Sequence, residues 1–229
     1  MPNWSWLPTS LALGAAGLAF AAPPAAIEIE YEVLRNGSAM AEVVERLEHG
    51  NGAYQLTETW KGKGLYALLG KAKRTSAGSF GPDGPRPHEF MDERTGRATQ
   101  HVWFDWKANT ITRRYKGPVR TEPVPPDTQD RLSFLLALGF LSRKGEPISL
   151  HIADGRGMSR HTYRLNGRER LAIPAGQFDT MKLFRRNEGS GEVSEIWLAA
   201  DRSYLPVRIV VQEKNGTRYE HVATRISHP

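Results

Sequence analysis

The sequence predicts a mainly β protein, in which a curved antiparallel sheet or open barrel with meander connectivity packs on one buried α-helix. Three observations lead to this expectation. Apolar and polar residues alternate with a period of two through most of the chain. Turn residues recur about every 8–12 positions. One segment alone has apolar residues near helical spacing.

The expected strands follow from the alternation. Residues 26–34 read AIEIEYEVL, so four apolar side chains share one face and three glutamates the other. Asn36-Gly37 ends this strand, and Asn215-Gly216 marks a similar hairpin turn near the end of the chain. Further strands are expected at residues 39–47, around Tyr54, Leu56 and Trp60, and at 99–106, 110–115, 148–153, 161–165, 180–186, 193–198, 207–213 and 219–226.

The expected helix covers residues 128–141. Asp127 or Thr128 is the expected N-terminal cap, and Gly145 follows the helix. Apolar residues cover most of its circumference, so the helix should be largely buried. A second, short helix is expected at residues 65–71.

The N-terminal residues 1–22 match a secretory signal peptide cleaved near Ala21 or Ala22. The apolar run of about 12 residues is too short to span a bilayer, although the preceding segment lacks Lys and Arg; an uncleaved anchor is the alternative. Residues 23–229 are expected to form a single β-rich domain, with an internal seam at 117–126. No later apolar run approaches spanning length, so we expect a periplasmic protein without a transmembrane span in its mature chain.

Composition excludes several classes of chemistry. The chain has no cysteine, so thiol catalysis, disulfides and cysteine-ligated metals are ruled out. The histidines are scattered singly, and no nucleophile elbow or phosphate loop is present. We therefore expect no metal and no cofactor. The formal charge is +6, but no nucleic-acid motif accompanies it, so no nucleic-acid partner is expected.

Two groups of residues are candidates for binding. Large aromatic and apolar side chains fit the wall of an apolar cavity in a curved sheet, although core packing is the simpler interpretation of the same residues. A basic stripe on one strand face, Arg160 and Arg164, fits contact with an anion in the cell envelope. The expected cavity residues are Trp60, Trp103, Phe104, Trp106, Leu135, Phe140 and Trp197.

Three segments, in order, carry a resemblance to a known family. They are DRLS at 130–133, IPAGQFDTMKL at 173–183, and EIWLAAD at 195–201 followed by YLPVRI at 204–209. In order and spacing they resemble the bacterial exported domain-of-unknown-function family 3108. The resemblance implies an exported, β-rich envelope protein. The family has no established activity, so no catalytic residues are carried over from it.

Three functions remain open at this point. The first is a non-enzymatic protein that binds a lipid or other apolar or amphiphilic envelope ligand in its curved sheet. The second is an interaction or scaffold protein, with a filled core and a basic surface that docks an envelope protein partner. The third and least favoured is a hydrolase, which needs two of His101, His151, His161 and His221 beside an acid in one cleft.

Overall fold

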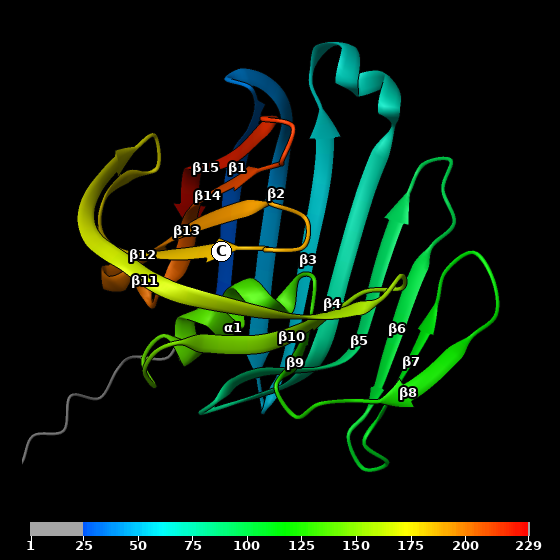
Figure 1. The fold of residues 1–229 in the computed structure, drawn as a ribbon. Coiled ribbons are helices and arrows are strands. Elements are labelled where there is room, and N and C mark those ends of the chain that lie inside the picture. The colour runs from blue at the N-terminus through cyan, green and yellow to red at the C-terminus, as the bar shows by residue number, and fades with distance from the viewer. Residues whose placement is uncertain (1–24, 229) are drawn as a thin grey trace, which may run out of the picture.

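A single, mainly antiparallel sheet of 15 strands makes up most of the molecule (Figure 1). The computed structural model describes residues 25–228, and the expected signal peptide lies outside the described residues. The order across the sheet is β8-β7-β6-β5-β4-β3-β2-β1-β15-β14-β13-β12-β11-β10-β9. The predicted fold, a curved and mainly antiparallel sheet with one helix, is confirmed.

The elements follow one another along the chain with short connections. The first half holds β1 (Ala26–Arg35), β2 (Ser38–Gly50), β3 (Ala53–Gly62), the 3₁₀ helix η1 (Gly64–Leu69), β4 (Lys71–Gly81), β5 (Gly84–Arg94), β6 (Gln100–Asp105), β7 (Thr110–Arg114) and β8 (Arg120–Pro123). The second half holds β9 (Thr128–Asp130), α1 (Ser133–Leu141), β10 (Ile148–Ala153), β11 (Met158–Ile173), β12 (Gly176–Arg186), β13 (Val193–Ala199), the 3₁₀ helix η2 (Ala200–Arg202), β14 (Leu205–Gln212) and β15 (Arg218–Ser227).

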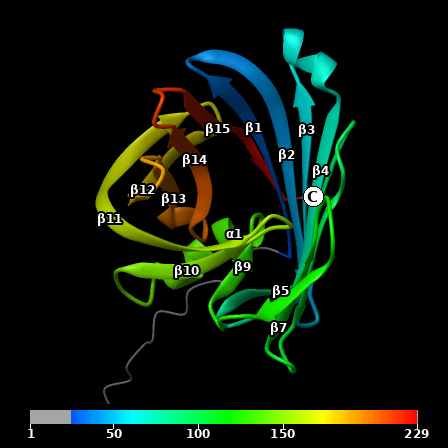
Figure 2. The same ribbon diagram turned by 45° about the vertical axis from the view of Figure 1, so that its right-hand side comes forward.

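The sheet grows outward in two directions from its centre, where β1 pairs with both β2 and β15. It then curls, so that strands from its two ends approach one another. Gln129 Nε2 of β9 donates a hydrogen bond to the Pro85 carbonyl of β5, at 2.9 Å. Gly155, in the β10–β11 turn, packs against Gln100 of β6. Figure 2 shows α1 lying inside this curve.

The helix is buried because it fills the concave side of the sheet. Leu132, Leu136 and Phe140 pack with residues of β1 to β6, while Leu135 and Leu138 pack with residues of β10 to β13. Apolar contacts therefore surround the helix, as its sequence predicts. Within residues 25–228, no helix is long and apolar enough to cross a membrane.

The helix begins five residues later than its sequence predicts. Residues 128–130 form β9, the one strand here that pairs in parallel, with β10. The expected caps Asp127 and Thr128 are therefore wrong: Leu132 is at the N-cap position, and the side chain of Asp130 satisfies backbone N–H groups at the start of the helix. Its Oδ1 accepts hydrogen bonds from the backbone N–H groups of Leu132 and Ser133, at 2.7 and 2.8 Å. Ser76 Oγ donates to Asp130 Oδ2 at 2.5 Å, which ties the start of the helix to β4.

Three further differences concern the strands and the short helix. Strands β4 and β5 were not expected, because their inward positions are partly polar. Strand β11 continues well past the expected end at residue 165, beyond a bulge between Leu165 and Arg168. The short helix expected at 65–71 is the 3₁₀ helix η1. Strands from both sides of the expected seam at 117–126 belong to the same sheet, and the seam segment itself contains β8.

Candidate ligand-binding site

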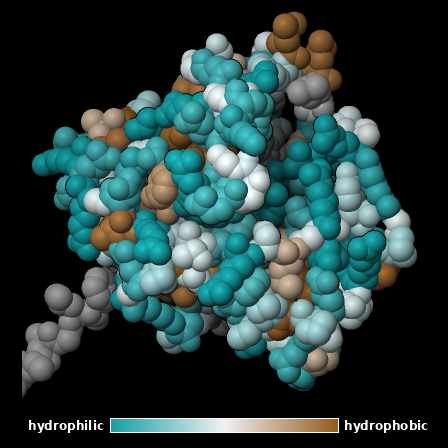
Figure 3. Space-filling model, viewed as in Figure 1, coloured by the Kyte–Doolittle hydropathy of each residue, from teal (hydrophilic) through white to brown (hydrophobic). Residues whose placement is uncertain are grey.

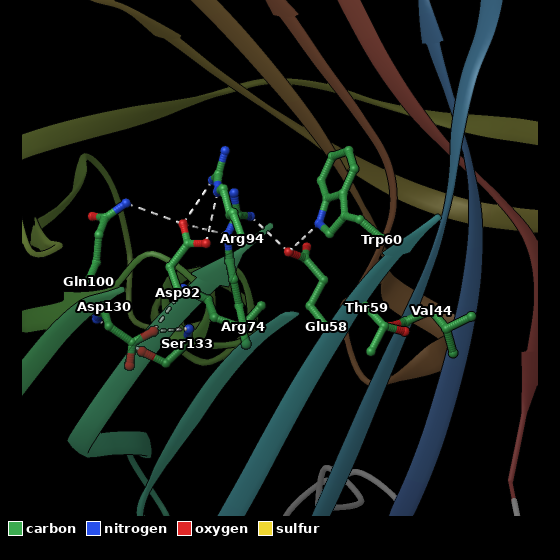
Figure 4. A network of polar contacts seen from close by, with 11 residues as sticks. Val44, Glu58, Thr59, Trp60, Arg74, Asp92, Arg94, Gln100, Asp130 and Ser133 are labelled. Atoms are coloured by element: carbon green, nitrogen blue, oxygen red, sulfur yellow. Dashed lines mark hydrogen bonds and ion pairs between the residues drawn. The ribbon is translucent and has the colours of Figure 1, made fainter. Parts of the chain in front are cut away.

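A row of polar residues crosses the concave face of the sheet. Glu45, Glu58, Arg74, Asp92 and Gln100 lie directly opposite one another on the neighbouring strands β2 to β6. We call these five residues the polar row. Side chains at such cross-strand positions are close enough to interact. Figure 4 shows four of them, with Trp60 and Arg94 at the next inward positions of β3 and β5.

Ion pairs join most of the polar row. Arg74 Nη1 lies 2.8 Å from Glu58 Oε1, and Arg74 Nε lies 3.3 Å from Asp92 Oδ2. Arg94 binds Asp92 with two parallel hydrogen bonds, 2.9 Å from Nε to Oδ1 and 2.8 Å from Nη2 to Oδ2. Gln100 Nε2 donates to the same carboxylate at 3.4 Å. Burial opposes the ionisation of Asp92, but Arg94 and Arg74 outweigh it, so the pKa of Asp92 lies below its usual value.

Glu45 has a different environment at the end of the polar row. Together with Ile27, Leu47 and Leu56 it lines a cavity of about 10 Å³, which has room for about one water molecule. Among the described residues, no hydrogen bond or ion pair reaches its carboxyl. Burial and, second, the charge of Glu58 raise the pKa of Glu45 to about 8. Glu45 is therefore mostly protonated at neutral pH.

Beside the polar row, a hollow of about 220 Å³ opens around Trp60. The indole nitrogen of Trp60 donates to Glu58 Oε1 at 2.6 Å, which fixes the ring. The ring of His221 meets it edge-on, with the centroids 5.3 Å apart. Burial lowers the pKa of His221 to about 4, so this ring behind Trp60 is uncharged at neutral pH. The hollow, the Trp60 pocket, is lined by Met40, Ala41, Trp60, Gly62, Tyr66, Gly70, Lys71, Ala72, Arg74, Arg94, Thr95 and Arg97.

The Trp60 pocket combines apolar walls with a basic rim. Met40, Trp60 and Ala72 are partly exposed there, beside the guanidinium of Arg94. Lys71 and Arg97 are exposed, and neither side chain forms an ion pair with another residue in the described part of the chain. The charges of Arg74 and Arg94 are balanced by Glu58 and Asp92. The excess charge of the site is therefore positive and lies at its rim.

Of the expected cavity residues, only Trp60 lines this pocket. Phe104, Leu135, Phe140 and Trp197 are buried in the two core clusters. The ring of Trp197 lies between Lys182 and Arg208, and its nitrogen donates to Glu169 Oε1 at 2.5 Å.

The other two expected rings lie away from the pocket. Trp103 stacks on His101 on the opposite face of β6, with the ring centroids 3.6 Å apart. Trp106 packs against Phe104, and its nitrogen donates to the Pro87 carbonyl at 2.7 Å. The sequence reasoning missed Glu58, Arg74, Asp92 and Arg94. Asp92 and Arg94 are two positions apart, so they lie on the same face of β5. This spacing predicts that they can pair, once β5 is known to be a strand.

The expected anion contacts lie on the surface of β11. Arg160 is opposite His151 in the pairing with β10, and Arg164 is opposite Phe184 in the pairing with β12. Both arginines are exposed. They share a strand face, as their spacing predicts, but neither lines the Trp60 pocket.

The four histidines considered for hydrolysis do not meet in one cleft. His101 pairs with Glu89 and His151 with Asp127, on separate elements. His161 Nε2 lies 3.0 Å from Ser159 Oγ, but its Nδ1 is buried without a hydrogen-bond partner among the described residues. Burial, with Arg185 and Arg131, lowers the pKa of His161 to about 4, which makes it a poor base at neutral pH. No group of three or more metal-ligating side chains occurs within residues 25–228.

Comparison with known proteins identifies one family. The model of the family described as "Protein of unknown function (DUF3108)" matches residues 27–222. One similar structure is a Bacteroides fragilis NCTC 9343 protein described as exported and of YmcC-like fold, with 10% identity, a TM-score of 0.39 and coverage of 88% of this chain and 95% of that one. Another is a Parabacteroides distasonis ATCC 8503 protein described as a lipoprotein, with 11% identity, a TM-score of 0.38 and coverage of 90% and 97%. No curated protein matches the chain.

Proposed function

The chain belongs to the DUF3108 family of proteins of unknown function, and we propose that it is a non-enzymatic periplasmic protein that binds an amphiphile with an acidic head group in the Trp60 pocket. The observation that carries this proposal is the pairing of apolar walls with unpaired cations at one open hollow. The leader pattern at residues 1–22 supports the periplasmic location.

The walls of the pocket suit a hydrocarbon segment. Met40, Ala72 and the ring of Trp60 are partly exposed in the hollow. Covering exposed apolar surface with a ligand favours binding by about 25 cal/mol for each Å² removed from water. The indole is held in place by Glu58 before any ligand arrives, so little side-chain entropy is lost on binding.

The rim of the pocket suits a negative charge. Lys71 and Arg97 have no acidic partner among the described residues, and Arg94 is partly exposed beside them. A carboxylate or phosphate at this rim gains charge-assisted hydrogen bonds. An uncharged head group can accept hydrogen bonds from these cations, but it forms no ion pair with them.

The size of the pocket limits how much of the ligand it encloses. Its volume is about 220 Å³, whereas pockets for whole drug-sized ligands usually have about 300–1,000 Å³. We therefore expect the pocket to hold one end of an amphiphile, while the rest of the molecule extends through the open side.

The test compares dodecanoate with dodecanol, two probes of the same chain length with a charged and an uncharged head group, by isothermal titration calorimetry on the mature protein. Dodecanoate should bind at least tenfold more tightly than dodecanol. Trp60→Ala should weaken both probes, and Arg97→Gln should weaken dodecanoate alone. Trp103→Ala removes an indole on the opposite face and serves as the matched control.

Two results contradict the proposal. One is failure of the wild-type protein to bind either probe. The other is equal binding by the Trp60→Ala and Trp103→Ala variants. Native mass spectrometry of protein purified from its own periplasm without detergent then identifies the natural ligand, as an adduct that disappears on extraction with organic solvent.

A further inference from the structure

The tip of the β3–β4 hairpin exposes a small apolar knob. Leu65 and Leu68 of η1 are each 85% exposed. Residues three apart lie on the same side of a 3₁₀ helix, so the two side chains form one protrusion. In Figure 3 it is visible as the brown group at the top of the molecule, where Figure 1 places η1. We call these two leucines the apolar knob.

The fold holds this exposed segment in place. A Cβ on Gly62 would lie 2.2 Å from the Tyr66 carbonyl oxygen, so η1 depends on glycine to fold back closely over the end of β3. At the other end, Gly70 adopts a φ of +81° and packs against Thr95. The Lys63 N–H donates to the Met40 carbonyl at 2.8 Å. Leucines fixed in solvent do not contribute to the core, which points to a partner outside the chain.

Lysines flank the apolar knob on both sides in the sequence. The sequence reads KGKGLYALLGKAKR from residue 61 to 74. Lys63 is paired with Glu32 and Glu42. Lys61, Lys71 and Lys73 are exposed and form no ion pair within the described residues. The three lysines lie on one face of the β3–β4 hairpin, because Lys61 is directly opposite Lys71 and Lys73 is two residues further along β4. Apolar side chains that project beside such a cluster of unpaired cations complement an anionic bilayer surface.

The shape of the tip favours a membrane over a protein partner. A stable protein interface needs about 800 Å² on each side, whereas the two leucines of the apolar knob lie at the end of a narrow hairpin. A bilayer needs no matching groove, because its acyl chains adapt to the inserted side chains.

We propose that the apolar knob docks this protein on the surface of an anionic phospholipid bilayer, with Leu65 and Leu68 inserted among the acyl chains and the flanking lysines on the head groups. Tyr66, from the same 3₁₀ helix, lines the Trp60 pocket. Docking therefore brings the Tyr66 side of the pocket close to the lipid. The docking itself does not depend on whether the pocket binds an amphiphile.

Vesicle co-sedimentation tests the docking. The mature protein should bind vesicles of phosphatidylglycerol and phosphatidylethanolamine, and bind less as salt rises or phosphatidylglycerol is omitted. The double variant Leu65→Ser/Leu68→Ser should bind at least tenfold more weakly. Leu165→Ser, at an exposed leucine of β11, should bind like the wild type. The circular dichroism spectrum of the double variant should be unchanged, which shows that it folds. Its affinity for dodecanoate should also be unchanged, which shows that the loss of vesicle binding does not come from the Trp60 pocket.

A single labelled cysteine tests insertion directly, because the chain has no cysteine of its own. An environment-sensitive fluorophore at Leu68→Cys should shift to the blue on addition of anionic vesicles, and the same label at Leu165→Cys should not. Equal vesicle binding by the wild type and the double variant overturns the proposal. So does a protein dimer that forms in solution and is lost in the double variant, since a second copy then covers the apolar knob.

Discussion

Glu45 of β2 lies directly opposite Glu58 of β3, on the concave face of the sheet. Glu58 has a cation beside it, with Arg74 at 2.8 Å, whereas Glu45 has apolar neighbours. Two like charges at such a position repel. The fold avoids this repulsion because Glu45 keeps its proton, with a pKa raised to about 8 by burial and by Glu58.

Glu45 should make the protein less stable as the pH rises. The unfolded chain releases this proton near pH 4.5, while the folded chain keeps it up to about pH 8. The free energy of unfolding therefore falls between these values. Glu45→Gln should raise the free energy of unfolding by about 2 kcal/mol at pH 8 and change it little at pH 4.5. The value at pH 8 is smaller than the full pKa shift implies, because the side chain is only half-buried and solvent screens part of the effect.

Urea unfolding at both pH values measures this effect. Glu48→Gln, at an exposed position of the same strand, should leave the pH dependence unchanged. An unaltered pH dependence in the Glu45→Gln variant is the result that contradicts the assignment.

Asp130 should be a key residue for the stability of the helix. It accepts two backbone N–H groups at the start of α1 and a hydrogen bond from Ser76 of β4. Asp130→Ala leaves these buried donors unsatisfied and should lower the free energy of unfolding by about 2–4 kcal/mol. Asp130→Asn keeps one acceptor oxygen and should lose about half as much. Denaturant unfolding measures both.

The control for Asp130 is Asp127→Ala. Asp127 pairs with His151 at a partly exposed position and does not contact the helix start. Its removal should change the free energy of unfolding by less than about 1 kcal/mol. A loss as large as that of Asp130→Ala disagrees with a helix that begins at Ser133.

Gly155 should be required where the β10–β11 turn meets β6 and β7. A Cβ there would lie 2.8 Å from the Gln100 Cβ and 3.0 Å from the Arg114 carbonyl oxygen. Gly155→Ala should therefore lower the free energy of unfolding by about 1–3 kcal/mol. Hydrogen exchange should also rise in β6 and β7, because the two parts of the sheet separate more easily.

Gly157 offers a matched control in the same turn, since a Cβ there meets nothing within 4 Å. Gly157→Ala should be neutral or slightly stabilising, because alanine restricts the unfolded chain. Thermal unfolding compares the two variants. Equal effects of the two substitutions are inconsistent with a close contact at Gly155.

Much of the fold is predictable because its signals are local. Ile27, Ile29, Tyr31 and Val33 alternate with glutamates, and all four are at most 3% exposed. The helix is apolar on most sides and is surrounded by core residues. Its first residue was misplaced because β9 owes its strand conformation to pairing with β10, more than 20 residues away.

Two strands of the site, β4 and β5, are not predictable from the sequence pattern because of their charged residues. Positions that face the concave side of β4 and β5 include Arg74, Ser76, Asp92 and Arg94. An apolar alternation cannot reveal a strand whose inward side chains are charged. The polar row that distinguishes the site thus removed the periodicity by which its strands are recognised.

By itself, the sequence determined the strand-rich class, the buried character of the helix and the basic, cysteine-free composition, because these depend on neighbouring residues and on counts. Only the tertiary structure decided that Glu58, Arg74 and Asp92 pair, and that Trp60 alone of the aromatic candidates lines the Trp60 pocket. The physical reason is that strand register and sheet curvature arise from pairings between distant segments. These pairings choose which side chains of each strand meet.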